Sequence, residues 1–324
     1  MEAVEKGILK KQQTILRSEA PSRAQRVIMD GDILFQCVRP YQKNNYLHKG
    51  QNNDKTQWVA STGYAQIRTT ESPSYLYHTL NTDGFNKKVM VRCTGSSYPA
   101  INSDDLSTIH FYFSPQKEEQ RKISQLFDLL DERIATQNKI IDKLQSLIKG
   151  TAHKVSQQGK PNTRLSECLL CTSSTLQESD VAELGAYPVY GANGIVGYLD
   201  TYNTTSEAIY IIKDGSGVGT VSYVNGKCSA TGTLNILQAN EGFSLRYLYF
   251  MLKVFGFEPY KTGMAIPHIY FKDYGKAKIY CPNYELQNKY ANLLYEIEQK
   301  ATIEQKILDN LCSQKQFLLR QMFI

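Results

Sequence analysis

Long apolar runs are missing from this chain of 324 residues, so no segment is long and apolar enough to predict a transmembrane helix. The first residues also lack the apolar core of a secretory signal, and we therefore expect a cytoplasmic protein that enters no membrane. Cysteine is scarce: the seven residues are odd in number and their spacings form no disulfide framework. The five histidines form no close-spaced cluster, which argues against a metal centre built on histidine.

Catalytic signatures are absent as well. The chain contains no GxSxG, HExxH, GxxxxGK[ST] or NPPY-type motif; residues 281–284 come nearest to the last of these but lack its first residue and second proline. Residues 214–219 resemble a glycine-rich cofactor loop, yet strand-like residues follow where such a loop needs a helix, which favours a hairpin turn. We therefore predict no catalytic, cofactor-binding or metal-binding residues.

Two further motifs allow more than one interpretation. Cys168 and Cys171 form a lone CxxC, and because structural zinc usually needs a second pair of ligands, two small apolar residues near a strand are the better interpretation. His268 lies inside a repeated segment, where a packing or capping role is favoured over catalysis.

An internal repeat organises what is present. Thr94-Gly95 and Pro99 match Thr262-Gly263 and Pro267 at a constant offset of 168 positions, and the following residues match at an offset of 167. The repeat predicts a globular unit followed by a long helix, twice over. The expected parts are a first domain at 1–113, a spacer helix at 114–150, a second domain at 151–284 and a second spacer helix at 285–324.

The two spacer helices are the clearest local prediction. Ser114 and Pro115 suit a helix start, and Gly150 suits its end. Apolar residues recur every seven positions in both segments, a pattern typical of a coiled coil, with one polar exception in each at equivalent positions. We expect the two helices to pair through Ile123, Phe127, Leu130, Ile134, Gln137, Ile141 and Leu144 of the first and Leu294, Ile297, Glu304, Leu308 and Leu311 of the second.

Antiparallel pairing of these helices would place the two domains at opposite ends of a spacer of about 55 Å. In the alternative, each helix lies only on its own domain. The domains themselves are predicted to be mostly strand, with strands over 31–39, 207–213 and 219–224 and a helix over 244–256. The fold class is therefore α+β, with two domains joined by two long helices.

The first domain is expected to be short at its N-terminus by about 20 residues relative to the second. Gly150 precedes Thr231 by 81 residues, whereas only 61 residues precede the equivalent Thr62.

Tyrosine is abundant, with 22 residues against a single tryptophan, and it offers an apolar body with a polar tip. Tyrosines, amides and cations in loops suit a surface that reads base edges and holds phosphates, although any single tyrosine also suits a core or strand position. The candidate DNA contacts, chosen for residue type and loop position, are Lys43, Lys49, Arg68, Lys87 and Lys88 in the first domain and Tyr190, Asn193, Lys213, Ser216 and Lys227 in the second.

Four segments together resemble the specificity subunit of type I restriction-modification systems. In chain order they are LFDLLDERIATQNKIIDKLQSLIKG (126–150), YPVYGANGIVGYLD (187–200), GSGVGTVSYVNGK (215–227) and TGMAIPHI (262–269). This order is typical of that family. The resemblance implies two target-recognition domains on double-stranded DNA and spacer helices that set their separation. It also implies two modification subunits and restriction subunits as partners, which would bring S-adenosylmethionine, ATP and Mg²⁺, with none of these cofactors on this chain.

The function predicted from this resemblance is recognition of a split, asymmetric DNA target and scaffolding of the partner subunits. Two other functions stay open. A coiled-coil adaptor would share the helices without reading DNA, and an S-adenosylmethionine-dependent methyltransferase would need the glycine-rich loop to open a helix.

Overall fold

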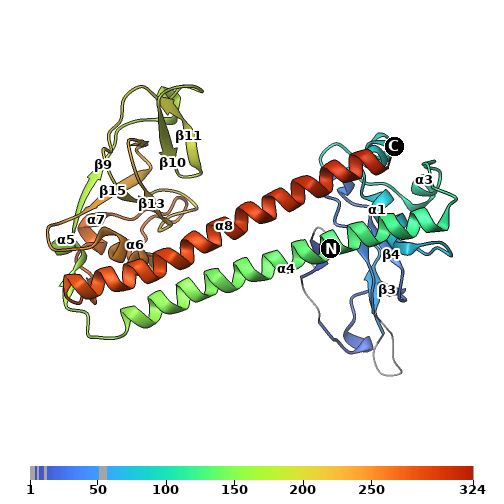
Figure 1. Cartoon of the computed structure of the whole chain (residues 1–324), viewed down its shortest axis with the longest axis horizontal. Coiled ribbons are helices and arrows are strands. Elements are labelled where there is room, and N and C mark those ends of the chain that lie inside the picture. The colour runs from blue at the N-terminus through green and yellow to red at the C-terminus, as the bar shows by residue number, and fades with distance from the viewer. Residues whose placement is uncertain (1–3, 6, 11–12, 51–56, 324) are drawn as a thin grey trace. The chain divides into compact units, whose positions relative to one another are not determined.

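The computed structural model describes residues 4–5, 7–10, 13–50 and 57–323. Two compact units make up the chain. Unit 1 consists of Met1–Lys139 and Gln305–Ile324, and unit 2 consists of Ile140–Glu304. Figure 1 shows the two long helices, α4 (Lys117–Ser156) and α8 (Tyr284–Met322), each of which contributes residues to both units.

Unit 1 is built on a three-stranded antiparallel sheet of order β5-β4-β7, with two smaller strand pairs, β3-β6 and β1-β2, beside it. The strands are β1 (Val4–Glu5), β2 (Ile8–Leu9), β3 (Ala24–Val27), β4 (Ile33–Gln36), β5 (Tyr46–Leu47), β6 (Val59–Ser61) and β7 (Tyr64–Ile67). The short helices are η1 (Arg17–Glu19), η2 (Pro40–Gln42), α1 (Pro73–Leu80), α2 (Asp83–Arg92) and α3 (Ser103–Ser107). Ser72, Thr82 and Asn102 each begin a helix by accepting a backbone N–H on the side-chain oxygen.

The core of unit 1 lies between β4 and the helices α1 and α2. Ile33 and Phe35 of β4 are fully buried and pack in one cluster with Val89 of α2. Phe35 meets Phe85 edge to face, with ring centroids 5.9 Å apart. The alternation of β4 side chains between two clusters follows from the period of a strand, since Leu34 packs on the opposite face.

Unit 2 contains a four-stranded antiparallel sheet of order β13-β12-β15-β9, a three-stranded sheet of order β11-β10-β14 and the pair β16-β8. The strands are β8 (Thr163–Arg164), β9 (Leu169–Ser173), β10 (Tyr187–Gly191), β11 (Gly194–Leu199), β12 (Ala208–Ile212), β13 (Val221–Val224), β14 (Ser229–Ala230), β15 (Leu234–Ala239) and β16 (Lys278–Ile279). The short helices are α5 (Leu165–Cys168), η3 (Glu178–Asp180), α6 (Leu245–Lys253), η4 (Glu258–Tyr260) and α7 (Phe271–Tyr274).

The core of unit 2 is larger. Ile209 and Ile211 of β12, both fully buried, pack against α6, whose Tyr247 and Leu248 are also fully buried. Tyr274 closes the same cluster, and its hydroxyl accepts a hydrogen bond of 3.1 Å from the Asn235 side chain. A polar tip satisfied in this way lets a large aromatic side chain be buried at little cost.

In each unit the two long helices pack against one another. In unit 1, Ile123 and Phe127 of α4 form a cluster with Leu318 and Met322 of α8. In unit 2, residues near the end of α4, such as Ala152, share the core with residues near the start of α8. The start of one helix therefore meets the end of the other in unit 1, and the reverse holds in unit 2, as in an antiparallel pair.

The twelve residues named above for helix pairing are all partly or fully covered. The buried ones are Ile123, Phe127, Gln137, Ile141, Leu294, Leu308 and Leu311. The half-buried ones are Leu130, Ile134, Leu144, Ile297 and Glu304.

Both ends predicted for the first long helix are wrong. The helix begins at Lys117, after Ser114, whose hydroxyl instead accepts from the Gln116 backbone N–H. It also runs through Gly150 to Ser156, because Ala152 and Val155 are buried in the core of unit 2. Packing of that last turn outweighs the cost of about 1 kcal/mol for a glycine inside a helix.

The sequence repeat has a structural counterpart at one loop of each unit. Thr94 and Ala100 form a bridge, as do Thr262 and His268 at equivalent positions. The glycine after each threonine is left-handed, with φ of +86° at Gly95 and +87° at Gly263. We call these segments, 94–100 and 262–268, the TG loops.

The prediction that the domains are mostly strand is wrong for the first domain, where the helices α1, α2 and α3 together hold more residues than the strands β1 to β7. The individual elements predicted from the sequence are present. The expected strands and helix correspond to β4, β12, β13 and α6, and residues 214–219 lie in the hairpin between β12 and β13. The α+β class with two long paired helices is confirmed. Among the residues that the structure describes, no helix is long and apolar enough to cross a membrane.

Candidate nucleic-acid interface

A hairpin of unit 2, β10–β11, carries the tyrosine- and glycine-rich segment. The two strands pair antiparallel, with an irregularity between Val189 and Tyr190 that shifts the register. Gly194 has a φ of +102° at the turn, a conformation that favours glycine. Asn193 is exposed at the tip of this turn, which leaves its amide free of cover by the fold.

An aromatic and cationic cluster lies beside this hairpin. The rings of Tyr187 and Tyr202 meet edge to face with centroids 4.9 Å apart. The exposed Lys227 ammonium lies 4.9 Å from the Tyr202 ring and 5.9 Å from the Tyr187 ring. Because the rings hold the ammonium while leaving it in solvent, the cluster can present a positioned charge to a phosphate or a base.

Tyr190 occupies a different environment from the other candidates. Its ring packs against Tyr210, which is almost fully buried, and burial raises the pKa of the Tyr190 hydroxyl. Its backbone carbonyl also accepts from the Thr231 N–H. This residue therefore supports the core beneath the hairpin, which is the alternative that the sequence left open for any single tyrosine.

The loop between β12 and β13 is tied to the TG loop of unit 2. The Gly215 N–H donates to the Pro267 carbonyl, and the His268 Nδ1 lies 2.8 Å from an oxygen of Asp214. The candidates Lys213, half-buried, and Ser216, exposed, belong to this fixed loop. The His268 ring thus joins the TG loop to the loop after β12, and its packing or capping role stays a prediction.

Unit 1 has the same arrangement after β4. The Arg39 N–H donates to the Pro99 carbonyl of the TG loop, as Gly215 does to Pro267. Arg39 is left-handed, with a φ of +54°, although it is not a glycine. Its guanidinium lies 4.4 Å from the centroid of the exposed Tyr98 ring. A cation held on an aromatic ring, at a backbone conformation that costs about 1–2 kcal/mol, points to a role in binding.

Two of the five candidates in unit 1 form close ion pairs within the fold. Lys43 lies 2.6 Å from Asp83. Arg68 donates two hydrogen bonds, of 2.7 and 2.8 Å, to the buried Asp32 carboxylate, and these hold the pKa of Asp32 at about 2. Both cations stabilise unit 1, so their role toward DNA stays a prediction.

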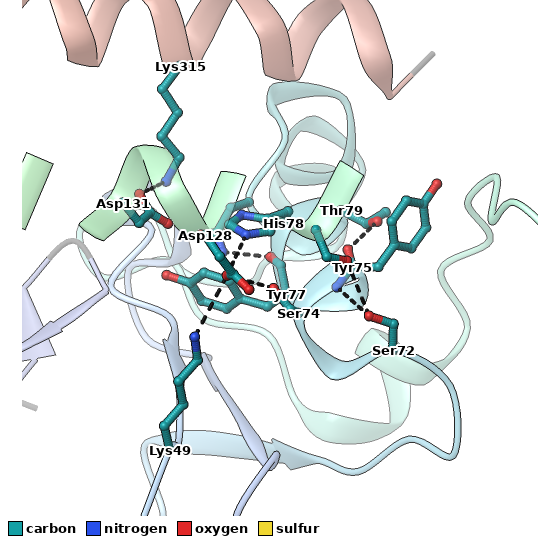
Figure 2. A network of polar contacts seen from close by, with 12 residues as sticks. Lys49, Ser72, Ser74, Tyr75, Tyr77, His78, Thr79, Asp128, Asp131 and Lys315 are labelled. Carbon is teal, nitrogen blue, oxygen red and sulfur yellow. Dashed lines mark hydrogen bonds and ion pairs between the residues drawn. The ribbon is translucent and has the colours of Figure 1, made fainter. Parts of the chain in front are cut away.

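The other three candidates of unit 1 lie apart from those ion pairs. The exposed Lys49 lies 3.8 Å from Asp128 of α4, a contact drawn in Figure 2. Lys87 and Lys88 are neighbours on α2, where Lys87 is exposed and Lys88 donates to the His110 carbonyl. The structure gives these three residues no shared site.

The sequence missed Arg39, Tyr98 and Tyr202. Arg39 and Tyr98 are 59 positions apart in the sequence, and Tyr202 and Lys227 are 25 apart, so no local spacing could reveal these contacts. A left-handed backbone at an arginine also has no signature in the sequence. Only the abundance of tyrosine could have drawn attention to such clusters.

Comparison with known proteins bears on this surface. Residues 25–146 and 169–312 match the family described as the type I restriction modification DNA specificity domain. The chain belongs to this family. It is a type I specificity subunit, which confirms the resemblance inferred from its motifs and the prediction of a non-catalytic role.

Relatives of known sequence fit this assignment. A protein named as a type I specificity subunit in Mycoplasma genitalium is 24% identical over 276 residues, which are 77% of this chain and 70% of the relative. The specificity subunit of the type I restriction enzyme HindI from Haemophilus influenzae is 26% identical over 134 residues, 40% of this chain and 28% of that protein.

Solved structures show the same fold. The crystal structure of the type I restriction-modification S subunit from M. genitalium matches with a TM-score of 0.67 and 18% identity, over 97% of this chain and 93% of that one. A structure concerned with complex assembly and conformational transition of the type I system matches with a TM-score of 0.55 and 21% identity, over 99% and 89% of the two chains.

Proposed function

We propose that this chain reads a split, asymmetric sequence in double-stranded DNA, with each unit contacting one part of it. One observation carries the proposal. Each unit ties a loop after the equivalent strand, β4 or β12, to a TG loop, yet the side chains on these loops differ. Arg39 and Tyr98 stand in unit 1 where Gly215 and Ile266 stand in unit 2. Two copies of one framework with different reading residues suit a target with two different parts.

The test measures which DNA positions depend on which unit. The chain is combined with its modification subunits, and the methylated sequence is determined by methylome sequencing for the wild type, Arg39→Ala and Lys227→Ala. We expect each variant to relax or weaken recognition in one part of the target, with a loss of about 1–3 kcal/mol in discrimination for a lost base contact. If Lys227 holds a phosphate instead, binding weakens for all sequences and the salt slope falls by about one.

Lys122→Ala is the matched control, because Lys122 is an exposed cation on α4, outside the TG loops and the loops after β4 and β12. The control should leave the methylated sequence unchanged. An identical methylated sequence with and without the chain would contradict the proposal.

We also propose that the chain scaffolds two modification subunits and the restriction subunits. Large apolar side chains that are exposed on the long helices support this, since exposed apolar surface often marks a contact with another protein. They are Leu126, Leu129, Ile307 and Phe317 in unit 1 and Leu147, Leu293 and Ile303 in unit 2. The adaptor alternative shares this surface but predicts no DNA-sequence dependence.

On this proposal the partner subunits carry the S-adenosylmethionine, ATP and Mg²⁺. The hairpin form of residues 213–220, rather than a loop that opens a helix, argues against the methyltransferase alternative. Ligand-induced thermal stabilisation of the isolated chain by S-adenosylmethionine would contradict this assignment.

A further inference from the structure

One edge of the main sheet is paired with a further strand in unit 2 and, among the described residues, has no such partner in unit 1. The equivalent strands are β4 and β12, since Val38 and Asp214 after them bridge to equivalent TG-loop residues. Their partners are β7 and β15, with Ile67 opposite Ile33 and Leu237 opposite Ile209. Strand β15 also pairs with β9, whereas β7 pairs with β4 alone among the described residues.

The segment that covers this edge in unit 2 is short. Residues 163–173 form a strand pair with β16, one turn of helix α5 and then strand β9. Leu165 and Cys168 are fully buried in the core, and Leu169 is 2% exposed. The segment therefore adds a strand to the sheet and inserts an apolar turn beneath it.

Unit 1 has a cavity of about 620 Å³ beside the open edge. Ala65, Ile67 and Phe111 are among the residues that line it, together with Leu106 and Ser107 of α3. Part of this space arises from smaller side chains: the repeat places Leu106 where Tyr274 stands in unit 2, and the strand pairing places Ala65 where Asn235 stands. In unit 2 the segment 163–173 also places Leu165, Cys168 and Leu169 in the core beside the equivalent edge.

The rim of the cavity is positively charged. Arg26 and Arg68 both line it, and the charge of Arg68 is met by Asp32. Arg26 donates to the Tyr64 backbone carbonyl, and no carboxylate of the described residues lies within ion-pair distance of it. An occupant with one carboxylate would complement this rim.

The described residues at the start of the chain do not cover the edge. Strand β3 pairs with β6, and β1 pairs with β2, so their backbone groups are used elsewhere. An unpaired strand edge next to an apolar cavity is a site for strand addition by another chain.

We propose that the β7 edge and this cavity bind a segment of another polypeptide. The segment would lie antiparallel to β7, carry one apolar helical turn with leucines spaced as Leu165 and Leu169 are, and bear a carboxylate toward Arg26. This inference concerns a protein-binding surface and does not depend on the DNA-reading proposal.

A labelled peptide of residues 161–174, with both cysteines replaced by alanine, is the probe, and fluorescence anisotropy with the full chain is the measurement. We expect saturable binding of one peptide per chain and slower hydrogen exchange at residues 65–69. A peptide with Leu165→Asp should bind at least about tenfold more weakly, because the buried position would then hold a charge.

Two variants of α3 locate the site. Ser107→Trp places a large ring in the cavity from an exposed position and should weaken binding at least about tenfold. Asp104→Trp, on the same helix but outside the cavity lining, should leave binding unchanged. Neither variant alters the loops proposed to read DNA, so the methylated sequence should persist in both.

The proposal is overturned if the peptide shows no saturable binding at millimolar concentration, or if Ser107→Trp binds it as well as the wild type does. Sedimentation of the chain alone tests another occupant. Self-association that Ser107→Trp abolishes would show that a second copy fills the surface, and this too would overturn the assignment to a different polypeptide.

Discussion

The helix α1 of unit 1 and the helix α6 of unit 2 occupy equivalent places against the long helices, yet they are held by different chemistry. In unit 1, Asp128 of α4 accepts from the Ser74 hydroxyl at 2.7 Å and lies 3.3 Å from the buried His78 ring (Figure 2). In unit 2, the Arg246 guanidinium instead lies 4.3 Å from the centroid of the Tyr295 ring.

The repeat aligns these residues pair by pair. The matching segments Tyr75-Leu76-Tyr77 and Tyr247-Leu248-Tyr249 align α1 with α6 at an offset of 172, so Ser74 corresponds to Arg246 and His78 to the buried Phe250. The offset of 167 in the long helices places Asp128 opposite Tyr295 in the alignment. One solution places a carboxylate beside a serine and a histidine, and the other places a cation over an aromatic ring. The contact geometry is thus shared while its chemistry is free to differ, and the consequences can be measured by exchanging residues between the units.

The largest effect is expected from Tyr274→Leu, which gives unit 2 the residue that unit 1 has at Leu106. The change removes a fully buried ring and leaves the Asn235 amide without its hydroxyl partner. We expect a loss of about 2–5 kcal/mol in the free energy of unfolding of unit 2. Hydrogen exchange at β12 and β15 measures it. The reverse change, Leu106→Tyr, enters the existing cavity of unit 1 and should cost far less; equal losses would contradict this account.

The two units also differ just before Ile33 and Ile209 of the equivalent strands β4 and β12. Unit 1 has the buried carboxylate Asp32 there, and unit 2 has Ala208. Asp32→Asn should lower the free energy of unfolding of unit 1 by about 1–3 kcal/mol, because the carboxylate accepts from Arg68, Gln66 and the Met29 N–H. Urea unfolding followed by fluorescence of Trp58, the single tryptophan, reports on this unit. The exposed Asp30 provides the control Asp30→Asn, for which no comparable loss is expected.

The lowered pKa of the same carboxylate predicts that the stability of unit 1 falls in acid. The pKa of Asp32 is lowered from 3.8 to about 2 in the folded chain. Its contribution to the free energy of unfolding is therefore complete at a pH well above 3.8, the pKa in the unfolded chain, and is lost as the pH falls toward 2. Asp32→Asn should therefore lose less stability than the wild type over this range. A wild type and variant with the same pH profile would refute the assignment.

The TG loops offer a finer comparison. A β-carbon on Gly263 would lie 2.4 Å from the Ile266 carbonyl oxygen, whereas one on Gly95 would lie 3.0 Å from that of Tyr98. Both residues are left-handed, so alanine costs about 1–2 kcal/mol at either site, and Gly263→Ala should cost more because its β-carbon would approach the backbone oxygen more closely. Thermal unfolding of the two variants ranks them, and a larger loss for Gly95→Ala would be the contrary result.

The smallest effect at neutral pH is expected from His78→Phe, which copies Phe250. Burial holds the pKa of His78 below its usual value, although the Asp128 carboxylate opposes this shift. A lowered histidine pKa means that the stability of unit 1 is complete above about pH 6.5 and falls as the pH drops below it. The positive charge of Lys315 further lowers the pKa of His78, whereas the negative charge of Asp131 raises it. Lys315 and Asp131 form an ion pair with each other, which Figure 2 shows.

The variant should therefore flatten the pH dependence of Trp58-monitored unfolding between neutral and mildly acidic pH. Phe250→His is the reciprocal control. It places a histidine where Tyr295 replaces the carboxylate, so unit 2 should become acid-sensitive. Parallel pH profiles for His78→Phe and the wild type would show that the ring does not govern this range.

The order of the elements could be read from the sequence alone. Heptad spacing and the offset of 167–168 residues predicted two long helices and two related domains, because both signals are regular spacings that the sequence itself displays. The family assignment followed from motifs in their order. The same resemblance implied the non-catalytic role.

The contacts, in contrast, were decided by tertiary structure. The helix that continues through Gly150 does so because later residues are buried, and Arg39 becomes a candidate only through its bond to the distant Pro99 and its place on Tyr98. Arg68 looked like a free surface cation and proved to be the partner of Asp32. Local patterns determine which elements form, whereas burial and pairing between distant residues determine which side chains remain available to bind, because the same residue can be solvated or satisfied according to what the fold brings beside it.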